Sequence, residues 1–77
     1  MDRSMLSLNE VASLLHISAA TVNYYTNIGL FRVSSRKGNR RLYDKAEVLR
    51  RIDKIKEMRS QGYPLVLIRQ MLEEQQK

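Results

Sequence analysis

The sequence has no cysteine and no tryptophan, and it contains a single proline. Without cysteine the chain can form no disulfide, no thiolate metal site and no cysteine nucleophile, and it lacks the cross-links that stabilise small secreted domains. No apolar run approaches the roughly 20 residues that a membrane helix needs, and the first residues lack the pattern of a signal peptide. We therefore expect a cytoplasmic protein without a membrane partner.

Groups that carry out catalysis or hold cofactors are equally scarce. His16 is the one histidine, no acidic pair stands beside it, and three glycines leave no glycine-rich phosphate loop. The sequence therefore predicts no enzyme, no catalytic residue, no metal site and no cofactor.

The chain has enough apolar residues to fold. It has 77 residues, which predicts a single domain spanning residues 1–77. Hydrophobic residues make up 43% of it, too many for a disordered basic tail, but only four tyrosines and one phenylalanine are aromatic. Its core must be aliphatic, and we expect a mostly helical fold.

Positive charge is concentrated in the middle of the chain. Lysine and arginine number 14 against eight aspartates and glutamates, a formal net charge of +6. Arg36, Lys37, Arg40 and Arg41 stand within six residues without an acid among them. Such a cluster favours a polyanionic partner, and an ordinary solvated loop is the alternative.

The segment from about residue 7 to about residue 29 has the pattern of two short helices. Ser7 and Glu10 have the spacing of a capping box, so a helix is expected to start there. Ser18 is placed to cap a second helix after a three-residue turn, and Gly29 to end it. This arrangement is typical of a helix-turn-helix, whose second helix commonly enters the major groove.

Residues of about 31–43 predict a β-hairpin. Residues 31–34 and 40–43 are extended candidates, and residues 35–39 between them form a basic turn containing Gly38. Because a two-stranded hairpin is marginal alone, it must pack on the helices through Leu30, Val33 and Leu42. A hairpin in this position is called a wing.

Residues of about 44–75 predict two more helices. Asp44 can cap the third helix, Gly62 can end it, and Pro64 stands where the fourth begins. The side chains expected to face inward from the third helix are Val48, Leu49, Ile52, Ile55 and Met58, and those expected on its basic outer side are Arg50, Arg51, Lys54 and Arg59. The predicted fold is a four-helix winged helix-turn-helix with a two-stranded wing between the second and third helices.

The fourth helix is more apolar than one buried stripe requires. Residues 65–68 are all apolar and cannot all point one way. Val66 and Leu67 either lie against the third helix or the corner at residues 61–63, or they contact a partner subunit.

Four motifs in register resemble the N-terminal DNA-binding domain of the mercuric-resistance regulator (MerR) family of bacterial transcription regulators. They are LNEVA at residues 8–12, YY at 24–25 followed by IGL at 28–30, GNRRLY at 38–43, and GYPL at 62–65 with Ile68. The resemblance spans residues 8–72. It implies a winged helix-turn-helix, a homodimer on a near-palindromic operator, and a second wing at the corner between the third and fourth helices.

The resemblance also implies roles for single residues and a further partner. In many members the dimer bends and untwists an overlong promoter so that RNA polymerase can engage it, which is readout by deformation. By position, Arg41 and Tyr43 match the wing motif that approaches phosphate, and Tyr24 matches an outward tyrosine of the second helix. Tyr63 with Arg59 falls at the second wing.

One departure from the family pattern concerns base recognition. Members often have arginine where this chain has Asn23. Asparagine favours a bidentate contact with adenine, whereas arginine favours guanine, so a different base preference is expected.

The candidate DNA-binding residues form three groups. They are Ser18, Ala20, Thr21, Asn23 and Tyr24 on the second helix, Arg36, Lys37, Arg40, Arg41 and Tyr43 on the wing, and Arg59 and Tyr63 at the second wing. The alternative for the helix residues is that they are ordinary surface residues without a DNA contact. The alternative for Tyr43 and Tyr63 is that they only pack against the body of the domain.

We predict a sequence-specific, DNA-binding transcription regulator. Two alternatives stay open at this point. One is an excisionase-like or architectural factor that bends DNA with the same fold. The other is a basic protein-interaction module whose Val66 and Leu67 recruit a partner and whose charge is incidental.

Overall fold

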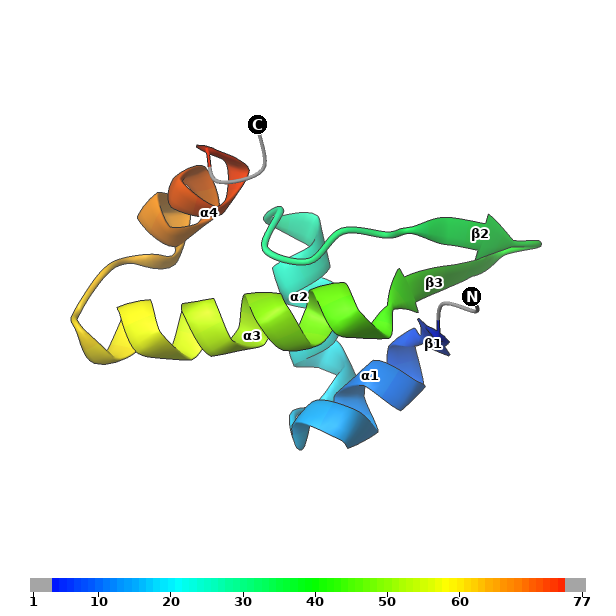
Figure 1. Ribbon diagram of the computed structural model, residues 1–77. Coiled ribbons are helices and arrows are strands. Elements are labelled where there is room, and N and C mark those ends of the chain that lie inside the picture. Colours follow the sequence, from blue (N-terminus) through cyan, green and yellow to red (C-terminus); the bar gives the residue numbers. More distant parts are fainter. Residues whose placement is uncertain (1–3, 75–77) are drawn as a thin grey trace.

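The computed structural model describes residues 4–74, and within them the chain forms four helices and a small sheet (Figure 1). The elements are β1 (Met5–Ser7), α1 (Leu8–Leu15), α2 (Ala19–Asn27), β2 (Ser35–Lys37), β3 (Arg40–Asp44), α3 (Lys45–Ser60) and α4 (Leu65–Glu74). This confirms the predicted winged helix-turn-helix. Residues 1–3 and 75–77 lie outside the described part of the chain. The expected ends of the fourth helix and of the predicted domain fall in the second of these ranges.

Side-chain caps fix the starts of the first two helices. Ser7 donates its amide to Glu10 Oε1 at 2.8 Å, and its hydroxyl accepts from the Glu10 amide at 3.2 Å, so the capping box is confirmed. The Ser18 hydroxyl accepts from the Thr21 amide at 3.0 Å at the start of α2. After α2 the chain turns at Gly29, whose φ of 91° lies in the region that favours glycine.

The prediction that residues 31–34 form the first hairpin strand was wrong. Leu30 and Phe31 are buried in the core, and both of their amides bond to the Tyr25 carbonyl at the end of α2. They are therefore tied to the helix and cannot pair with a strand. The ladder begins at Ser35, opposite Leu42, and leaves Gly38 and Asn39 as a two-residue turn.

A third strand was not expected. β1 pairs antiparallel with the other edge of β3, so the sheet order is β1-β3-β2, and the Lys45 amide bonds to the Ser4 carbonyl at 2.9 Å. A hairpin alone is marginal, and this edge strand supplies the additional support that it needs. Ser7 is both the last residue of β1 and the cap of α1.

The core lies where α1, α2, α4 and β3 meet the buried face of α3. Its fully buried side chains include Val11, Val22, Leu30, Tyr43, Ile55 and Ile68. Two expectations for α3 are corrected: Leu49, expected inside, is exposed, and Arg51, expected on the outer face, is only 3% exposed. Arg51 Nη1 donates to the Leu30 carbonyl, which compensates in part for burying the guanidinium, whose Nε and Nη2 have no hydrogen-bonding partner within residues 4–74.

On α4, Val66 is 62% exposed and Leu67 is 37% exposed. The exposure of Val66 contradicts its expected packing against α3 or the corner, whereas most of the Leu67 surface is covered. Ile68 and Leu72 supply the buried side of the helix.

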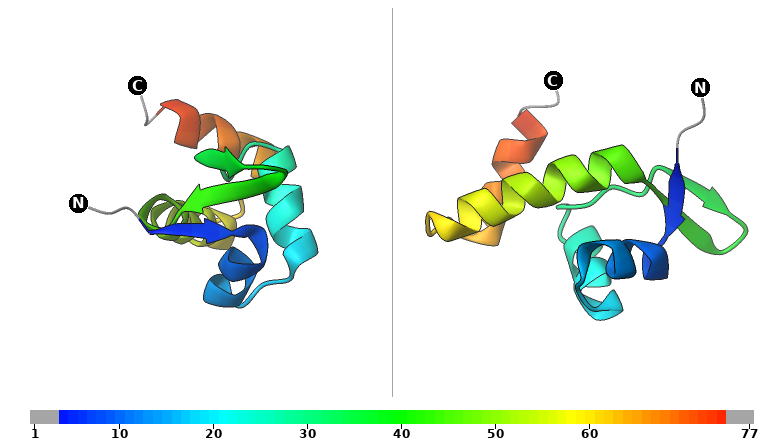
Figure 2. Two further views of the ribbon diagram at one scale, coloured as in Figure 1. Left: turned by 90° about the vertical axis from the view of Figure 1, so that its right-hand side faces the viewer. Right: turned by 60° about the horizontal axis from the view of Figure 1, so that its bottom comes forward.

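Figure 2 shows that the β2–β3 hairpin projects beyond the helices, near α1 and the start of α3. The α3–α4 corner lies at the far end of α3 in both Figure 1 and Figure 2. No helix within residues 4–74 is long and apolar enough to cross a membrane.

Candidate nucleic-acid interface

α2 presents several of the expected side chains to solvent. Ala20, Asn23 and Tyr24 are exposed, and Tyr24 retains 53% of its surface. The inward side of the helix is held by Val22, which is fully buried, and by Tyr25, whose ring meets Phe31 edge-on with centroids 5.6 Å apart. The exposed side chains of α2 therefore lie on a helix face whose opposite side packs into the core.

Ser18 and Thr21 are partly committed to the helix start. The Ser18 hydroxyl accepts from the Thr21 amide and also lies 2.8 Å from the Thr21 hydroxyl. Ser18 is exposed and Thr21 is half-buried. Both hydroxyls retain hydrogen-bonding capacity, but their first role is to cap α2.

An arginine of the hairpin contacts α2. Arg41 donates from Nη1 to Asn23 Oδ1 at 3.3 Å, joining residues that are 18 positions apart in the sequence. Beside this contact lies a groove of about 400 Å³ between the start of α1, α2 and the hairpin. Its lining residues are Ser7, Leu8, Asn9, Asn23, Asn39, Arg40 and Arg41.

The hairpin ladder places like charges opposite each other. Arg36 faces Arg41 and Lys37 faces Arg40 in the antiparallel register. Like charges directly opposite in a ladder are destabilising. No ion pair links any of these four side chains to another residue within the described range 4–74. The fold thus retains an unfavourable arrangement that a bound polyanion would neutralise.

The expectation for Tyr43 is corrected. Its side chain is fully buried, and its hydroxyl lies 2.8 Å from the Thr26 hydroxyl. Thr26 in turn donates to the Val22 carbonyl, so Tyr43 ties β3 to α2. A side chain without exposed surface cannot contact phosphate, and its role is structural.

We expect Tyr43→Phe to lower the free energy of unfolding by about 1 kcal/mol, because one buried hydrogen bond is lost while the ring remains. Affinity for DNA should not change in a sample that is fully folded. Urea denaturation and a binding titration measure the two effects. Tyr63→Phe is the matched control for stability, because Tyr63 is exposed. The free energy of unfolding of this variant should stay within about 0.5 kcal/mol of that of the unaltered protein. A drop in DNA affinity for Tyr43→Phe at unchanged stability would contradict the correction.

The second-wing residues lie apart from the hairpin. The corner after α3 is closed by two bonds, from the Gly62 amide to the Arg59 carbonyl and from the Tyr63 amide to the Met58 carbonyl. This pattern is a Schellman motif, and Gly62 has the positive φ that it requires. Arg59 and Tyr63 are exposed on this corner, at the opposite end of α3 from the hairpin.

The basic residues of α3 do not join the hairpin cluster. Arg51 is buried, and the exposed side of the helix mixes Arg50 and Lys56 with Asp53 and Glu57. A surface of alternating sign is typical of a solvated helix. The expected basic outer side of the third helix is therefore not formed as a continuous surface, and the exposed cluster of like charges is confined to the hairpin.

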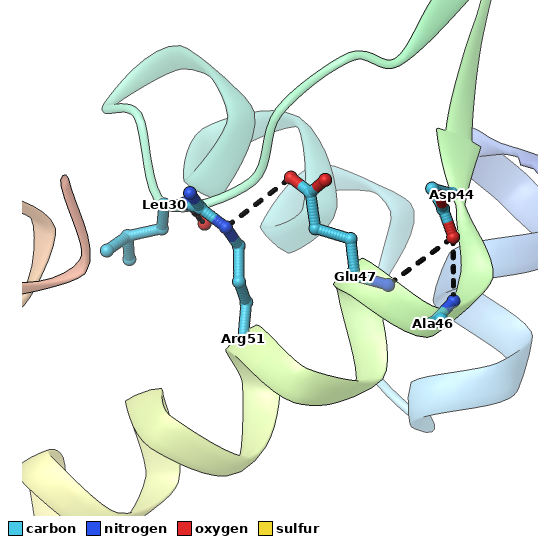
Figure 3. Close-up of polar contacts among 5 residues, drawn as sticks. All are labelled: Leu30, Asp44, Ala46, Glu47 and Arg51. Atoms are coloured by element: carbon cyan, nitrogen blue, oxygen red, sulfur yellow. Dashed lines mark hydrogen bonds and ion pairs between the residues drawn. The ribbon is translucent and has the colours of Figure 1, made fainter. Parts of the chain in front are cut away.

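Sequence reasoning missed the role of Arg51, which lies behind the recognition helix. Its Nη1 donates to the Leu30 carbonyl at 2.9 Å, and its Nε lies 3.5 Å from Glu47 Oε1 (Figure 3). Burial lowers the pKa of the Arg51 guanidinium below its usual value, and the Glu47 carboxylate opposes that shift. Because Leu30 follows α2 directly, this contact holds the end of the recognition helix against α3.

No group of metal-ligating side chains was found among residues 4–74. The exposed side chains of the hairpin and of α2 offer hydrogen-bonding groups and positive charge.

Comparisons with known proteins agree with this geometry. The model of the MerR helix-turn-helix family of regulatory proteins matches residues 6–75. The crystal structure of a transcriptional regulator of the MerR family from Bacillus cereus has the same fold, with a TM-score of 0.74 and 24% sequence identity. The alignment covers 90% of this chain and 52% of that protein, so the chain spans about half of the regulator's length. A comparison with curated proteins gave no match.

Proposed function

Since the chain belongs to the MerR family of helix-turn-helix regulatory proteins, which bind DNA, we propose that it reads an operator in the major groove with α2 and holds the DNA backbone with the β2–β3 hairpin. The family consists of transcription regulators rather than enzymes. The proposed activity is therefore sequence-specific regulation of transcription.

The observation that carries this proposal is the unneutralised ladder of the hairpin next to the exposed face of α2. Arg36 and Lys37 face Arg41 and Arg40 without an acid between them. Arg41 also contacts Asn23, so the side chain proposed to bind phosphate lies beside the one proposed to read a base. Ala20, Asn23 and Tyr24 would face base edges, and Ser18 and Thr21 would face the backbone at the start of the helix.

We propose further that the protein acts as a homodimer on a near-palindromic operator. Val66 and Leu67 are exposed apolar side chains on α4, which supports a contact with a second subunit. Arg59 and Tyr63 would then contact phosphates beyond the hairpin, and a dimer holding both regions could bend or untwist the DNA between them. RNA polymerase is a possible partner of such a complex.

The salt dependence of DNA binding tests the role of the hairpin. Arg36→Gln and Lys37→Gln should each reduce the slope of log affinity against log salt by about 0.9, because each removes one phosphate contact with its released counterion. Fluorescence anisotropy with a labelled 20-base-pair duplex at several salt concentrations measures the slope.

Lys56→Gln is the matched control for this titration, because it removes the same charge from the exposed side of α3. Its slope should equal that of the unaltered protein. Equal slopes for all three variants would contradict the assignment of the hairpin. If the unaltered protein bound no duplex even at low salt, a basic protein-interaction module would be the better interpretation.

A further inference from the structure

We propose that Arg41 is a positioning residue for base recognition: it holds the Asn23 side-chain amide in one of its two flip states and so makes base discrimination depend on the hairpin. This inference rests on the proposed function, since it concerns how the same surface reads DNA. It begins from the contact between Arg41 Nη1 and Asn23 Oδ1 at 3.3 Å.

The chemistry of the pair permits one orientation only. A guanidinium carries N–H donors and no acceptor, so it can bond to the carbonyl oxygen of an amide but not to its amino group. While Arg41 is in place, Asn23 Oδ1 must point toward the hairpin. The positions of the amide oxygen and nitrogen of Asn23 are therefore assigned by its neighbour.

Orientation matters because a base edge distinguishes the two flip states. Rotation about the last side-chain bond of asparagine is broad and roughly two-fold, so an exposed asparagine without a partner exchanges its oxygen and nitrogen readily. Asn23 is exposed on α2. A base pair presents donors and acceptors in a fixed order in the major groove, and only one flip state of the amide matches that order.

Arg41 can hold Asn23 and bind the DNA backbone at the same time. A guanidinium has five N–H donors, and the bond to Asn23 uses one of them. The side chain is half-buried, and it stands on β3 opposite Arg36. Binding of phosphate by Arg41 would fix its guanidinium further, and with it the amide that reads the base.

Arg36 does not share this role, although it has the same chemistry. It is exposed on β2, directly opposite Arg41, and no hydrogen bond joins its side chain to another residue within the range 4–74. Removing either guanidinium takes one positive charge from the hairpin. Only removal of Arg41 should also release Asn23.

The test measures base discrimination separately from affinity. Duplexes with a randomised 20-base-pair centre are enriched on the unaltered protein, and each position of the enriched duplex is then varied through the four base pairs in competition titrations. The Asn23→Ala variant identifies the position that Asn23 reads. In the unaltered protein the affinities for the best and the worst base pair at that position should differ by roughly 5- to 150-fold, and in Asn23→Ala their ratio should fall to about one.

At that position we expect Arg41→Met to lower the discrimination ratio by roughly 2- to 12-fold, the effect of releasing one side chain that was held in place. Arg36→Met should lower affinity for all four base pairs alike and leave the ratio unchanged. In the Asn23→Ala background, Arg41→Met should have no further effect on the ratio. Circular dichroism confirms that each variant is folded.

Two failures can be told apart. If Arg41→Met and Arg36→Met both weaken binding equally for every base pair, the positioning role of Arg41 is wrong while the proposed DNA-binding function stands. If the unaltered protein enriches no sequence from the randomised pool, sequence-specific recognition is wrong and the role of Arg41 is wrong with it.

Discussion

Replacing Arg51 with alanine is expected to lower the free energy of unfolding by about 3 kcal/mol, because the change leaves both partners of a buried cation without it. The Leu30 carbonyl loses its donor at 2.9 Å, and Glu47 Oε1, which has no hydrogen-bonding partner within residues 4–74, loses the cation that lies 3.5 Å from it. A domain of this size is stabilised by only about 4–12 kcal/mol. The substitution should therefore remove a large part of its stability.

Urea denaturation followed by circular dichroism measures this effect. Arg50→Ala is the matched control, because Arg50 precedes Arg51 on the same helix and is exposed. Its stability should change by no more than about 0.5 kcal/mol. Arg51→Met retains the apolar stem and should lie between the two. Equal stability of Arg50→Ala and Arg51→Ala would show that the buried contact contributes little.

The second large effect is expected for Gly29→Ala, which should cost about 2 kcal/mol or more. Gly29 has a φ of 91°, where a side chain is strained, and a Cβ built there would lie 2.8 Å from Arg69 Cδ. Gly29 follows the end of α2, and Arg69 belongs to α4. The substitution should therefore loosen both the end of the recognition helix and its contact with α4.

Gly62→Ala separates the two causes. Gly62 has nearly the same φ, 90°, but nothing lies within 4 Å of its Cβ position. It should show the cost of strain alone, so Gly29→Ala should be the more destabilising change. In an Arg69→Ala background, the difference between the two substitutions should shrink. A cost for Gly29→Ala no greater than that for Gly62→Ala, with or without Arg69, would contradict the close approach.

Features that depend on a few neighbouring residues could be predicted from the sequence. The capping box at Ser7, the caps at Ser18 and Asp44, and the glycine ends of α2 and α3 are all present in the structure. Each depends on a hydrogen bond or a backbone angle set within about four residues. Local chemistry was enough to place all four helices.

Features that depend on distant partners could not be predicted in this way. Residues 5–7 form a strand only because β3, which pairs Tyr43 with Leu6, offers a free edge far along the sequence. The spacing of apolar residues on α3 does not show which side of the buried face the rest of the chain covers. For this reason the exposure of Leu49 and the burial of Arg51 could not be predicted. Arg51 is buried because the Leu30 carbonyl meets it there, and nothing near Arg51 in the sequence indicates that contact.

The candidate site also has features that the sequence predicts and features that it does not. The basic cluster of the hairpin and the outward face of α2 follow from composition and spacing, and both are exposed as expected. The family resemblance matched Tyr43 to a wing residue that approaches phosphate, with packing against the body as the alternative. The structure has the packed arrangement, in which the Tyr43 hydroxyl lies beside the Thr26 hydroxyl. The contact between Arg41 and Asn23 could not be predicted from the sequence, because no sequence pattern relates residues 18 positions apart.

Ser7 ends β1 and caps α1, so the sheet and the helix-turn-helix are joined at a single residue. Tyr43 and Arg41 fasten the same sheet to α2 from the other side. These two contacts link the hairpin to α2. We propose that a duplex that engages both must adapt to the separation that the contacts set, so that the DNA deforms more than the protein does.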